Sequence, residues 1–196
     1  MQKSPRDDEF EPMSKMAEAE VSVRLASWLI NQGFVEGCVD VAIDGAQVRV
    51  RDEMHFDLPT FLKGCGWIAD SNGSAWQCGY RRAGGSIQLR VHSNPGKGDV
   101  VARLRSGAIF RAECKKGPLL RSRSSQEYPL LREALGQLLT VEEIGEGDVL
   151  AVAVPHGEKF VELAARWRRA PLVRRLCIQI LTVAPDGNVD GFEMPA

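Results

Sequence analysis

The chain has 196 residues, of which 44% are hydrophobic and 26% are charged, a balance typical of a globular domain that buries its own core. Its 25 Lys and Arg residues against 26 Asp and Glu residues give a net charge of −1, which excludes coating of nucleic acid by bulk positive charge. No apolar run approaches the roughly 20 residues that span a bilayer, so no membrane partner is expected. Five cysteines without regular spacing favour a reducing compartment, the cytoplasm, over a disulfide framework.

The start of the chain differs in pattern from the rest. Residues 1–13 mix charges with two prolines and show no periodicity, so they are predicted to form a flexible leader. Residues 14–196 are predicted to form a single domain. Within it, residues 52–85 are the least regular stretch and are interpreted as an insertion that serves substrate choice.

An amphipathic helix is predicted over residues 14–32. Apolar residues recur there at helical spacing from Val21 to Leu29, with Ser14 as the N-cap and Gly33 as the C-terminal stop.

Two glutamates at the start of this helix are candidate functional residues. Glu18 falls on the apolar stripe, and a carboxylate on a buried face needs a partner, a proton or a metal. Glu20 falls on the face of Arg24 instead. The structural alternative is that Glu18 sits in the first helical turn, where acidic side chains interact favourably with the helix dipole.

The middle of the chain is predicted to be rich in antiparallel strands. The Asp44-Gly45 pair between two alternating runs predicts a hairpin, and Pro59 suits the start of a short helix. A tight turn is predicted at Ser106-Gly107. The strand-like runs cover residues 39–43, 48–50, 75–81, 86–92, 99–105 and 108–114.

The last third alternates between helices and buried strands. The expected elements are a helix at 126–143, a strand at 148–155, a helix at 157–170 and a strand at 176–185. Strands separated by helices join a sheet through crossovers. The predicted fold class is therefore α/β, a mixed β-sheet flanked by helices.

The segment 94–118 holds the most informative polar residues. Glu113 and Lys115 are two positions apart on one predicted strand, so their side chains lie on the same side of it. The hairpin that turns at Ser106-Gly107 brings the start of the preceding strand, Asp99, beside them. The sequence thus predicts two carboxylates and an ammonium group at one end of a sheet.

This set of groups suits a hard divalent cation. Carboxylate oxygens are the ligands preferred by Mg²⁺ and Mn²⁺, which lower the pKa of bound water and offset charge on a phosphoryl oxygen. A lysine beside the ion can orient that water. The alternative interpretation is a solvated edge-strand ion pair of Glu113 with Lys115 or Arg111.

With these residues, the chain resembles the PD-(D/E)XK nuclease superfamily, which has the restriction-endonuclease-like fold. The core of that family runs helix, three antiparallel strands, helix, strand (αβββαβ). The matching segments here are 14–32, 86–92, 99–105, 108–114, 126–143 and 148–154, so that the resemblance covers most of residues 14–185.

The resemblance assigns roles to particular residues. Asp99 matches the motif aspartate, and Glu113-Cys114-Lys115 matches the acid-x-lysine element, so Asp99 and Glu113 would bind the metal and Lys115 would position the attacking water. Glu18 matches a metal-associated glutamate of the first helix, with Glu20 second, and Gln137 matches a supporting glutamine.

Two departures from the family pattern stand out. Gly98 precedes the aspartate where proline is common. Gln137 is followed four residues later by Val141 and not by tyrosine, so the RecB-like branch is not supported.

The resemblance implies an Mg²⁺- or Mn²⁺-dependent endonuclease that hydrolyses DNA and leaves a 5′-phosphate, often as a homodimer. Two alternatives stay open. One is a catalytically inactive module of the same fold that binds DNA or a protein partner. The other is an α/β interaction domain in which the acid-x-lysine pair is coincidental.

Basic residues surround the proposed ligands. Between residues 97 and 123 the only acids are Asp99 and Glu113, which indicates a face that attracts phosphate, although a solvated basic loop is the alternative. The residues expected to contact a DNA backbone are Lys97, Arg111, Lys116, Arg121 and Arg123. A second cluster, which extends this surface or binds an acidic partner, comprises Arg166, Arg168, Arg169, Arg174 and Arg175.

Overall fold

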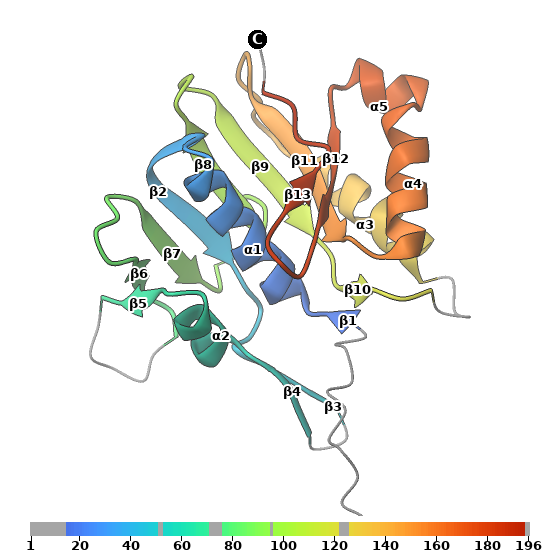
Figure 1. The fold of residues 1–196 in the computed structure, drawn as a ribbon. Coiled ribbons are helices and arrows are strands. Elements are labelled where there is room, and N and C mark those ends of the chain that lie inside the picture. Colours follow the sequence, from blue (N-terminus) through green and yellow to red (C-terminus); the bar gives the residue numbers. More distant parts are fainter. Residues whose placement is uncertain (1–14, 51–52, 71–75, 95, 122–125, 195–196) are drawn as a thin grey trace, which may run out of the picture.

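The structure is a computed structural model, and it describes residues 15–50, 53–70, 76–94, 96–121 and 126–194. In this part of the chain a large mixed sheet is flanked by helices, with α1 on one face and α3 and α4 on the other (Figure 1). The protein is therefore α/β, as the sequence predicts. No described helix is long and apolar enough to cross a membrane.

Most strands lie between α1 and α3, and the last third of the chain alternates helices with strands. The elements are β1 (Lys15–Met16), α1 (Glu18–Asn31), β2 (Val35–Ala42), β3 (Gln47–Val50), β4 (Glu53–Asp57), α2 (Leu58–Gly64), β5 (Ile68–Ala69), β6 (Gly79–Arg81), β7 (Gln88–His92), β8 (Val100–Leu104), β9 (Ile109–Cys114), β10 (Gly117–Pro118), α3 (Glu127–Leu138), β11 (Val149–Pro155), α4 (Glu158–Arg168), α5 (Pro171–Arg175), β12 (Gln179–Val183) and β13 (Val189–Asp190).

The main sheet has nine strands in the order β13-β12-β11-β9-β8-β2-β7-β6-β5. Strand β8 runs antiparallel to both of its neighbours, β2 and β9, whereas β9, β11 and β12 are mutually parallel. The parallel strands are linked by crossovers through α3 and α4, which explains why their sequences separate strands by helices. Two small ribbons, β1–β10 and β3–β4, lie outside this sheet.

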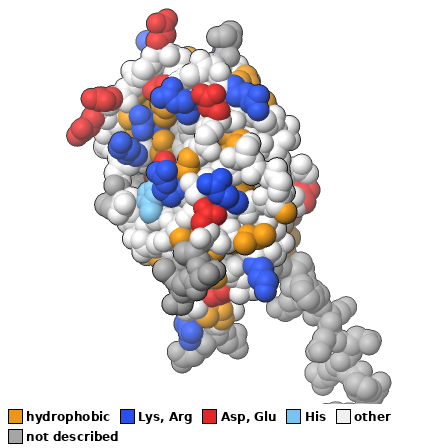
Figure 2. All heavy atoms as spheres, turned by 90° about the vertical axis from the view of Figure 1, so that its left-hand side faces the viewer, with side chains coloured by type: hydrophobic (Ala, Val, Ile, Leu, Met, Phe, Trp, Pro, Cys, Tyr) orange, Lys and Arg blue, Asp and Glu red, His pale blue; other side chains and the backbone are white. Residues whose placement is uncertain are grey.

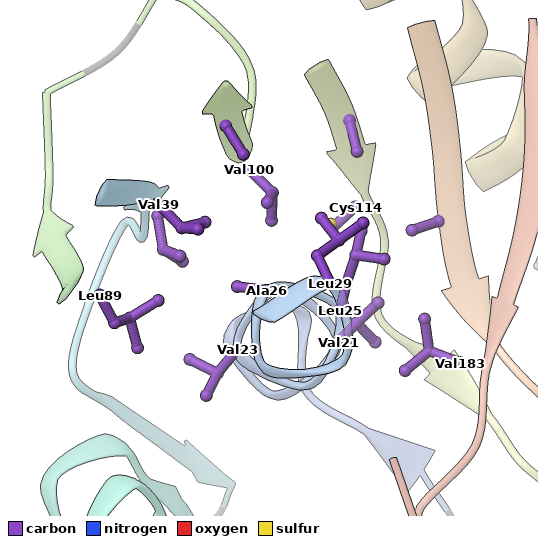
Figure 3. Close-up of a cluster of buried hydrophobic side chains, with 14 of the residues drawn as sticks. Val21, Val23, Leu25, Ala26, Leu29, Val39, Leu89, Val100, Cys114 and Val183 are labelled. Carbon is purple, nitrogen blue, oxygen red and sulfur yellow. The ribbon is translucent and has the colours of Figure 1, made fainter. Parts of the chain in front are cut away.

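The core has two parts, one on each face of the sheet. Along β11 every residue is buried, and alternate side chains enter opposite parts: Ala151 and Ala153 face the α1 side, while Val152 and Val154 face α3 and α4. Figure 3 shows Val21, Leu25 and Leu29 of α1 gathered beside Cys114 of β9. A strand buried on both faces reads as a continuous apolar run, which is the pattern from which it was predicted.

Several predicted elements are confirmed with small changes of boundary. The first helix ends at Asn31, and Gly33, with a φ of 71°, follows it as the predicted stop. Its start was predicted too early: Lys15 and Met16 form β1, and the helix begins at Glu18 with Ala17 as N-cap. The short helix α2 carries Pro59 in its first turn, and the β8–β9 hairpin turns at Ser106-Gly107. The helix predicted to reach residue 143 ends at Leu138. Ser14 and the predicted leader, residues 1–13, lie outside the described residues.

The pairing of the middle strands differs from the prediction. The Asp44-Gly45 pair does not connect a hairpin, because β2 pairs with β7 and β8 in the main sheet, while β3 pairs with β4. Alternation along the chain specifies that two runs are strands but not which partner each takes.

The residues at 86–92 also take a different place. They form β7, which pairs in parallel with β2 and is separated from β8 by that strand. The antiparallel neighbour of β8 is therefore β2, not the strand predicted from this run. Between β2 and β8 the chain adds the β3–β4 ribbon, α2 and strands β5 to β7.

Candidate functional site

A cavity of about 520 Å³ lies where β8 begins, β9 ends and α1 begins. Its described lining comprises Glu18, Ala42, Ile43, Asp44, Ser93, Asn94, Gly96, Lys97, Gly98, Asp99, Glu113, Lys115, Lys116, Leu130, Glu133, Gln137, Thr140 and Val141. The structure thus brings Asp99, Glu113, Lys115 and Glu18, four residues from three separate elements, to one place.

The β8–β9 hairpin fixes Asp99. Its backbone N–H donates to the carbonyl of Ala112 at 2.9 Å, and its Oδ2 accepts a 2.7 Å hydrogen bond from the backbone N–H of Cys114. Burial raises the pKa of Asp99 to about 6, with a further contribution from the Glu18 carboxylate, against the opposing effects of the Cys114 N–H and Lys115. Asp99 is therefore an anchored carboxylate whose negative charge is only partly compensated.

The conformation of Gly98 accounts for the missing proline before Asp99. Gly98 has a φ of 110°, which the ring of proline cannot adopt. A Cβ atom at this position would also lie 3.3 Å from the carbonyl oxygen of Ala112. Glycine thus permits the close approach through which Asp99 joins β9.

Glu113 lies on the face of β9 that opens into the cavity, while Ala112 and Cys114 on either side of it are buried. Burial, together with the neighbouring carboxylates of Asp99 and Glu18, raises the pKa of Glu113 to about 7, while Lys115 opposes this shift. A half-buried carboxylate whose pKa is raised by neighbouring carboxylates is in surroundings that favour binding of a cation.

Lys115 continues the path of β9 and is only 5% exposed. Its backbone N–H donates to the carbonyl of Ala153 at 2.9 Å, and its Nζ forms a 3.1 Å ion pair with Glu133 of α3. Burial alone would lower the pKa of Lys115, but the Glu18 and Glu133 carboxylates outweigh burial and raise it. The ammonium group therefore stays charged inside the cavity.

The β1–β10 ribbon positions Glu18. Met16 pairs with Gly117 and Lys15 with Pro118, just beyond Lys115, so the first residue of α1 starts at the rim of the cavity. The Ser22 hydroxyl donates to the Glu18 carbonyl at 3.0 Å. Glu18, the first of the two predicted glutamates, is the one that lines this cavity.

Glu20 points elsewhere and has a structural partner. It is 1% exposed and forms a 2.8 Å ion pair with Arg24 one turn later. Its position on the face of Arg24 agrees with the spacing in the sequence.

Helix α3 supplies the opposite wall of the cavity. Gln137, predicted from the family resemblance, lines it, and so does Glu133. Glu133 was not among the predicted site residues, although a signal was present: Leu130, Glu133 and Gln137 recur at steps of three and four and share one face of α3. Asp44 was missed as well, because its pairing with Gly45 suggested a turn.

The basic residues predicted to contact DNA separate into groups. Lys97 and Lys116 line the cavity. Arg111 of β9 does not line it. Arg111 lies opposite Val101 of β8, and its Nε is buried without a hydrogen-bond partner in the described structure. Arg121 is exposed and forms an ion pair with Glu162 of α4. Arg123 lies outside the described residues.

A further basic surface lies on the outer strands of the sheet. Figure 2, a view from the side of the β5–β7 edge, shows Lys and Arg side chains gathered with a few acidic side chains among them. Arg90 of β7 pairs with Asp40, and Arg81 of β6 pairs with Asp70, both at 3.3 Å. These pairs neutralise part of that surface. Lys97 and Lys116, by contrast, line the cavity of Asp99 and Glu113 and form no ion pair within the described residues.

The donor chemistry of the cavity fits a divalent cation through two carboxylates. Five carboxylates and three lysines belong to its described lining, which leaves an excess of negative charge when all are ionised. Asp99 and Glu113 provide hard oxygen donors, and Mg²⁺ is commonly held by one or two carboxylates together with waters and substrate phosphates. Among the residues that the structure describes, no group of three or more Asp, Glu, His or Cys residues is arranged to hold a metal, so Glu18 faces the site without completing such a group.

Comparisons with known proteins give no relative to which this site could be matched. No family model matches the chain, and no similar curated protein or solved structure was found, so that the interpretation of the site depends on its own geometry.

Proposed function

We propose that the chain is a metal-dependent endonuclease of the restriction-endonuclease-like, PD-(D/E)XK type that hydrolyses phosphodiester bonds of DNA. One observation carries the proposal: Asp99, Glu113 and Lys115 come from two adjacent antiparallel strands and line one cavity, together with Glu18. This is the set of groups that metal-assisted attack of water on a phosphodiester requires.

The strand arrangement supports the proposed fold. Helix α1 is followed by strands β2, β8 and β9, which are antiparallel neighbours, then by α3 and by β11, which is parallel to β9. This order is compatible with the αβββαβ core that the proposed family would have, with β2 as the first strand. The ribbon, helix and strands between β2 and β8 are then an addition to that core.

Each residue has a role in the proposed reaction. Asp99 and Glu113 bind the cation, which when present polarises the phosphoryl oxygen and makes a coordinated water more acidic. Lys115 orients the attacking water, and Glu133 holds the Lys115 ammonium in place through their 3.1 Å ion pair. Gln137 and Glu18 face the same space and complete its polar wall.

Cleavage of supercoiled plasmid, single-stranded DNA and branched DNA in Mg²⁺ or Mn²⁺ tests the proposal. Asp99→Asn and Glu113→Gln are each expected to reduce the rate by about 10² or more, because each removes a charged ligand. Asp44→Asn is the matched control: it removes a carboxylate of the same cavity that is outside the proposed ligand set, and it should cleave at nearly the wild-type rate.

The alternative, an inactive module of the same fold, predicts a different result. Wild type and Asp99→Asn would then bind DNA or a protein partner equally well, and neither would cleave DNA in either metal. Such an outcome would overturn the enzyme while leaving the fold assignment intact.

A further inference from the structure

A second cavity, of about 750 Å³, lies beside the candidate site. Its described lining comprises Lys15, Met16, Ala17, Glu20, Val48, His55, Phe56, Lys116, Gly117, Pro118, Gln126, Pro129 and Leu130. Lys116 and Leu130 line both cavities, so the two spaces share a wall.

Three pieces of the fold enclose this second cavity. The β1–β10 ribbon and the start of α3 form its walls on the side of the main body. The β3–β4 ribbon forms the outer wall, and Figure 1 shows it projecting away from the rest of the molecule. Val48 pairs with Phe56 across this ribbon, next to a register shift at Arg49, and both line the cavity.

The lining has the composition of a site for a flat, mostly apolar group. Its apolar walls include Met16, Val48, Phe56, Pro118 and Leu130. The polar side chains among them are those of Lys15, Lys116, His55, Gln126 and Glu20, and Glu20 is already paired with Arg24. Apolar walls with a small number of polar groups are typical of small-ligand sites, and aromatic side chains offer a stacking surface to bases.

We propose that this cavity binds one unpaired nucleobase of the strand that is cut in the adjoining site. The inference rests on the proposed function, because it takes the ligand to be a nucleic acid. Since the cavities share a wall, a phosphate beside Asp99 and Glu113 and a base of the same or the next nucleotide occupy adjoining spaces. Lys116 lines both cavities, so its ammonium group is available to the sugar-phosphate chain that would connect them.

The proposal has a consequence for substrate preference. Extruding a paired base costs the free energy of unpairing and unstacking it. This free-energy cost is smallest for a base that has no pairing partner. The protein should therefore favour DNA with an unpaired base, such as a single-base bulge, over fully paired DNA of the same length.

Binding of two matched duplexes tests the inference without cleavage. All proteins carry Asp99→Asn to prevent cleavage, and Mg²⁺ is present. The protein with this substitution alone is the reference protein. One duplex contains a bulged 2-aminopurine, and the other contains 2-aminopurine paired with thymine. Fluorescence anisotropy gives each Kd, and 2-aminopurine emission reports whether the base has left the helix. The reference protein should bind the bulged duplex about tenfold more tightly, with a change in emission.

Val48→Glu places a carboxylate in the cavity and should abolish this preference while leaving the Kd for the paired duplex nearly unchanged. Met54→Glu is the matched control, because Met54 is an exposed apolar residue of the same ribbon that does not line the cavity. It should keep the preference. Gln126→Glu adds a carboxylate from the opposite wall at a helix N-cap, where an acid is well tolerated, and should act like Val48→Glu.

The outcomes separate this inference from the proposed function. Suppose that wild type cleaves plasmid DNA but the reference protein binds both duplexes equally. The proposed base site is then wrong, while the proposed nuclease activity is supported. The same conclusion follows if Val48→Glu and Met54→Glu change the preference for the bulged duplex equally. If wild type neither binds nor cleaves DNA, both proposals fall. Loss of preference in Val48→Glu and Gln126→Glu, and its retention in Met54→Glu, supports the base site.

Discussion

Asp99 and Glu113 are the residues whose chemistry is most altered by the fold. Burial and neighbouring carboxylates, Glu18 for both groups and Asp99 for Glu113, raise the pKa of Asp99 to about 6 and that of Glu113 to about 7. The same side chains in an unfolded chain ionise near pH 4. The folded protein therefore binds protons at these groups more tightly than the unfolded chain does. Their ionisation opposes folding unless a cation is present.

The sign of this linkage gives a prediction about pH. Stability that depends on the protonated Asp99 is fully present below about pH 4 and is lost as the pH rises through 6. Asp99→Asn should therefore raise the metal-free Tm more at pH 8 than at pH 4, because the amide keeps an oxygen for the Cys114 N–H. Differential scanning fluorimetry in a chelating buffer measures this; an increase that does not depend on pH would contradict the assigned cause.

Metal binding should show the opposite dependence. Since protons compete with a cation for Asp99 and Glu113, Mn²⁺ should raise the Tm of the wild type more at pH 8 than at pH 6. The shift should vanish in Glu113→Gln and persist in Asp44→Asn. A Mn²⁺-induced shift of equal size in Glu113→Gln would place the ion elsewhere.

Glu18 and Glu20 are neighbouring acids with different surroundings, since Glu18 lines the cavity and Glu20 is buried against Arg24. Glu18→Gln removes one of several carboxylates from a negative cavity and should change the free energy of unfolding by less than about 1 kcal/mol. Glu20→Gln weakens a buried ion pair with Arg24 and should reduce the free energy of unfolding by about 1–3 kcal/mol. Urea denaturation measures both free energies of unfolding. A larger loss for Glu18→Gln than for Glu20→Gln would mean that Glu18, and not Glu20, stabilises the fold.

Among the elements, the short β1–β10 ribbon has an importance beyond its length. It packs where glycines permit close contact: a Cβ at Gly117 would overlap the Phe160 ring, and one at Gly157 would overlap the Pro118 carbonyl. These contacts hold β10 against α4 and thereby fix the start of α1 next to Lys115.

Gly157→Ala tests this packing. Because the new methyl group meets backbone atoms, β10 must move, and we expect a loss of about 1–3 kcal/mol in the free energy of unfolding, with weaker Mn²⁺ binding. Gly136→Ala, in the interior of α3 with open space around it, should instead stabilise the protein by about 0.5–1 kcal/mol. If both variants have the same free energy of unfolding in urea, the close contact at Gly157 does not contribute to stability as proposed.

Element by element, local patterns predicted most helices and strands but not their partners. The β8–β9 hairpin was predictable because its turn, its alternation and its two strands are contiguous in sequence. The insertion of β2 between β7 and β8 was not, since partner choice depends on crossovers that no local pattern encodes. For the same reason the two-residue strands β1 and β10 were missed.

For the molecule as a whole, the near-zero net charge conceals which basic residues are paired with acids and which are not. Lys97 and Lys116 lie at the cavity without ion pairs in the described structure, whereas Arg121 is engaged with Glu162 of α4. The sequence showed that basic residues cluster between 97 and 123. It could not show which of them are neutralised, because the acids that neutralise them come from distant parts of the chain.

Salt dependence of DNA binding tests this distinction. Each phosphate contact that is lost should reduce the slope of log K against log salt by about 1. Lys97→Gln and Lys116→Gln should each do so, whereas Arg121→Gln should leave the slope nearly unchanged. Anisotropy titrations with a fully paired duplex measure all three; a reduced slope for Arg121→Gln would show that the arginine leaves Glu162 to contact DNA.

The pairing of Lys15 and Met16 with Gly117 and Pro118 connects the strand ahead of α1 mechanically to the candidate site. A pull that peels this strand away would withdraw Glu18 from the reaction centre and free the segment after Lys115, while the nine-stranded sheet stays whole. Because Met16 is 1% exposed in the folded protein, the same pull would also open one edge of the core. If the chain is the proposed nuclease, force applied at Lys15 would therefore regulate its activity, and a tension sensor or a light-driven clamp fused there would exploit this coupling.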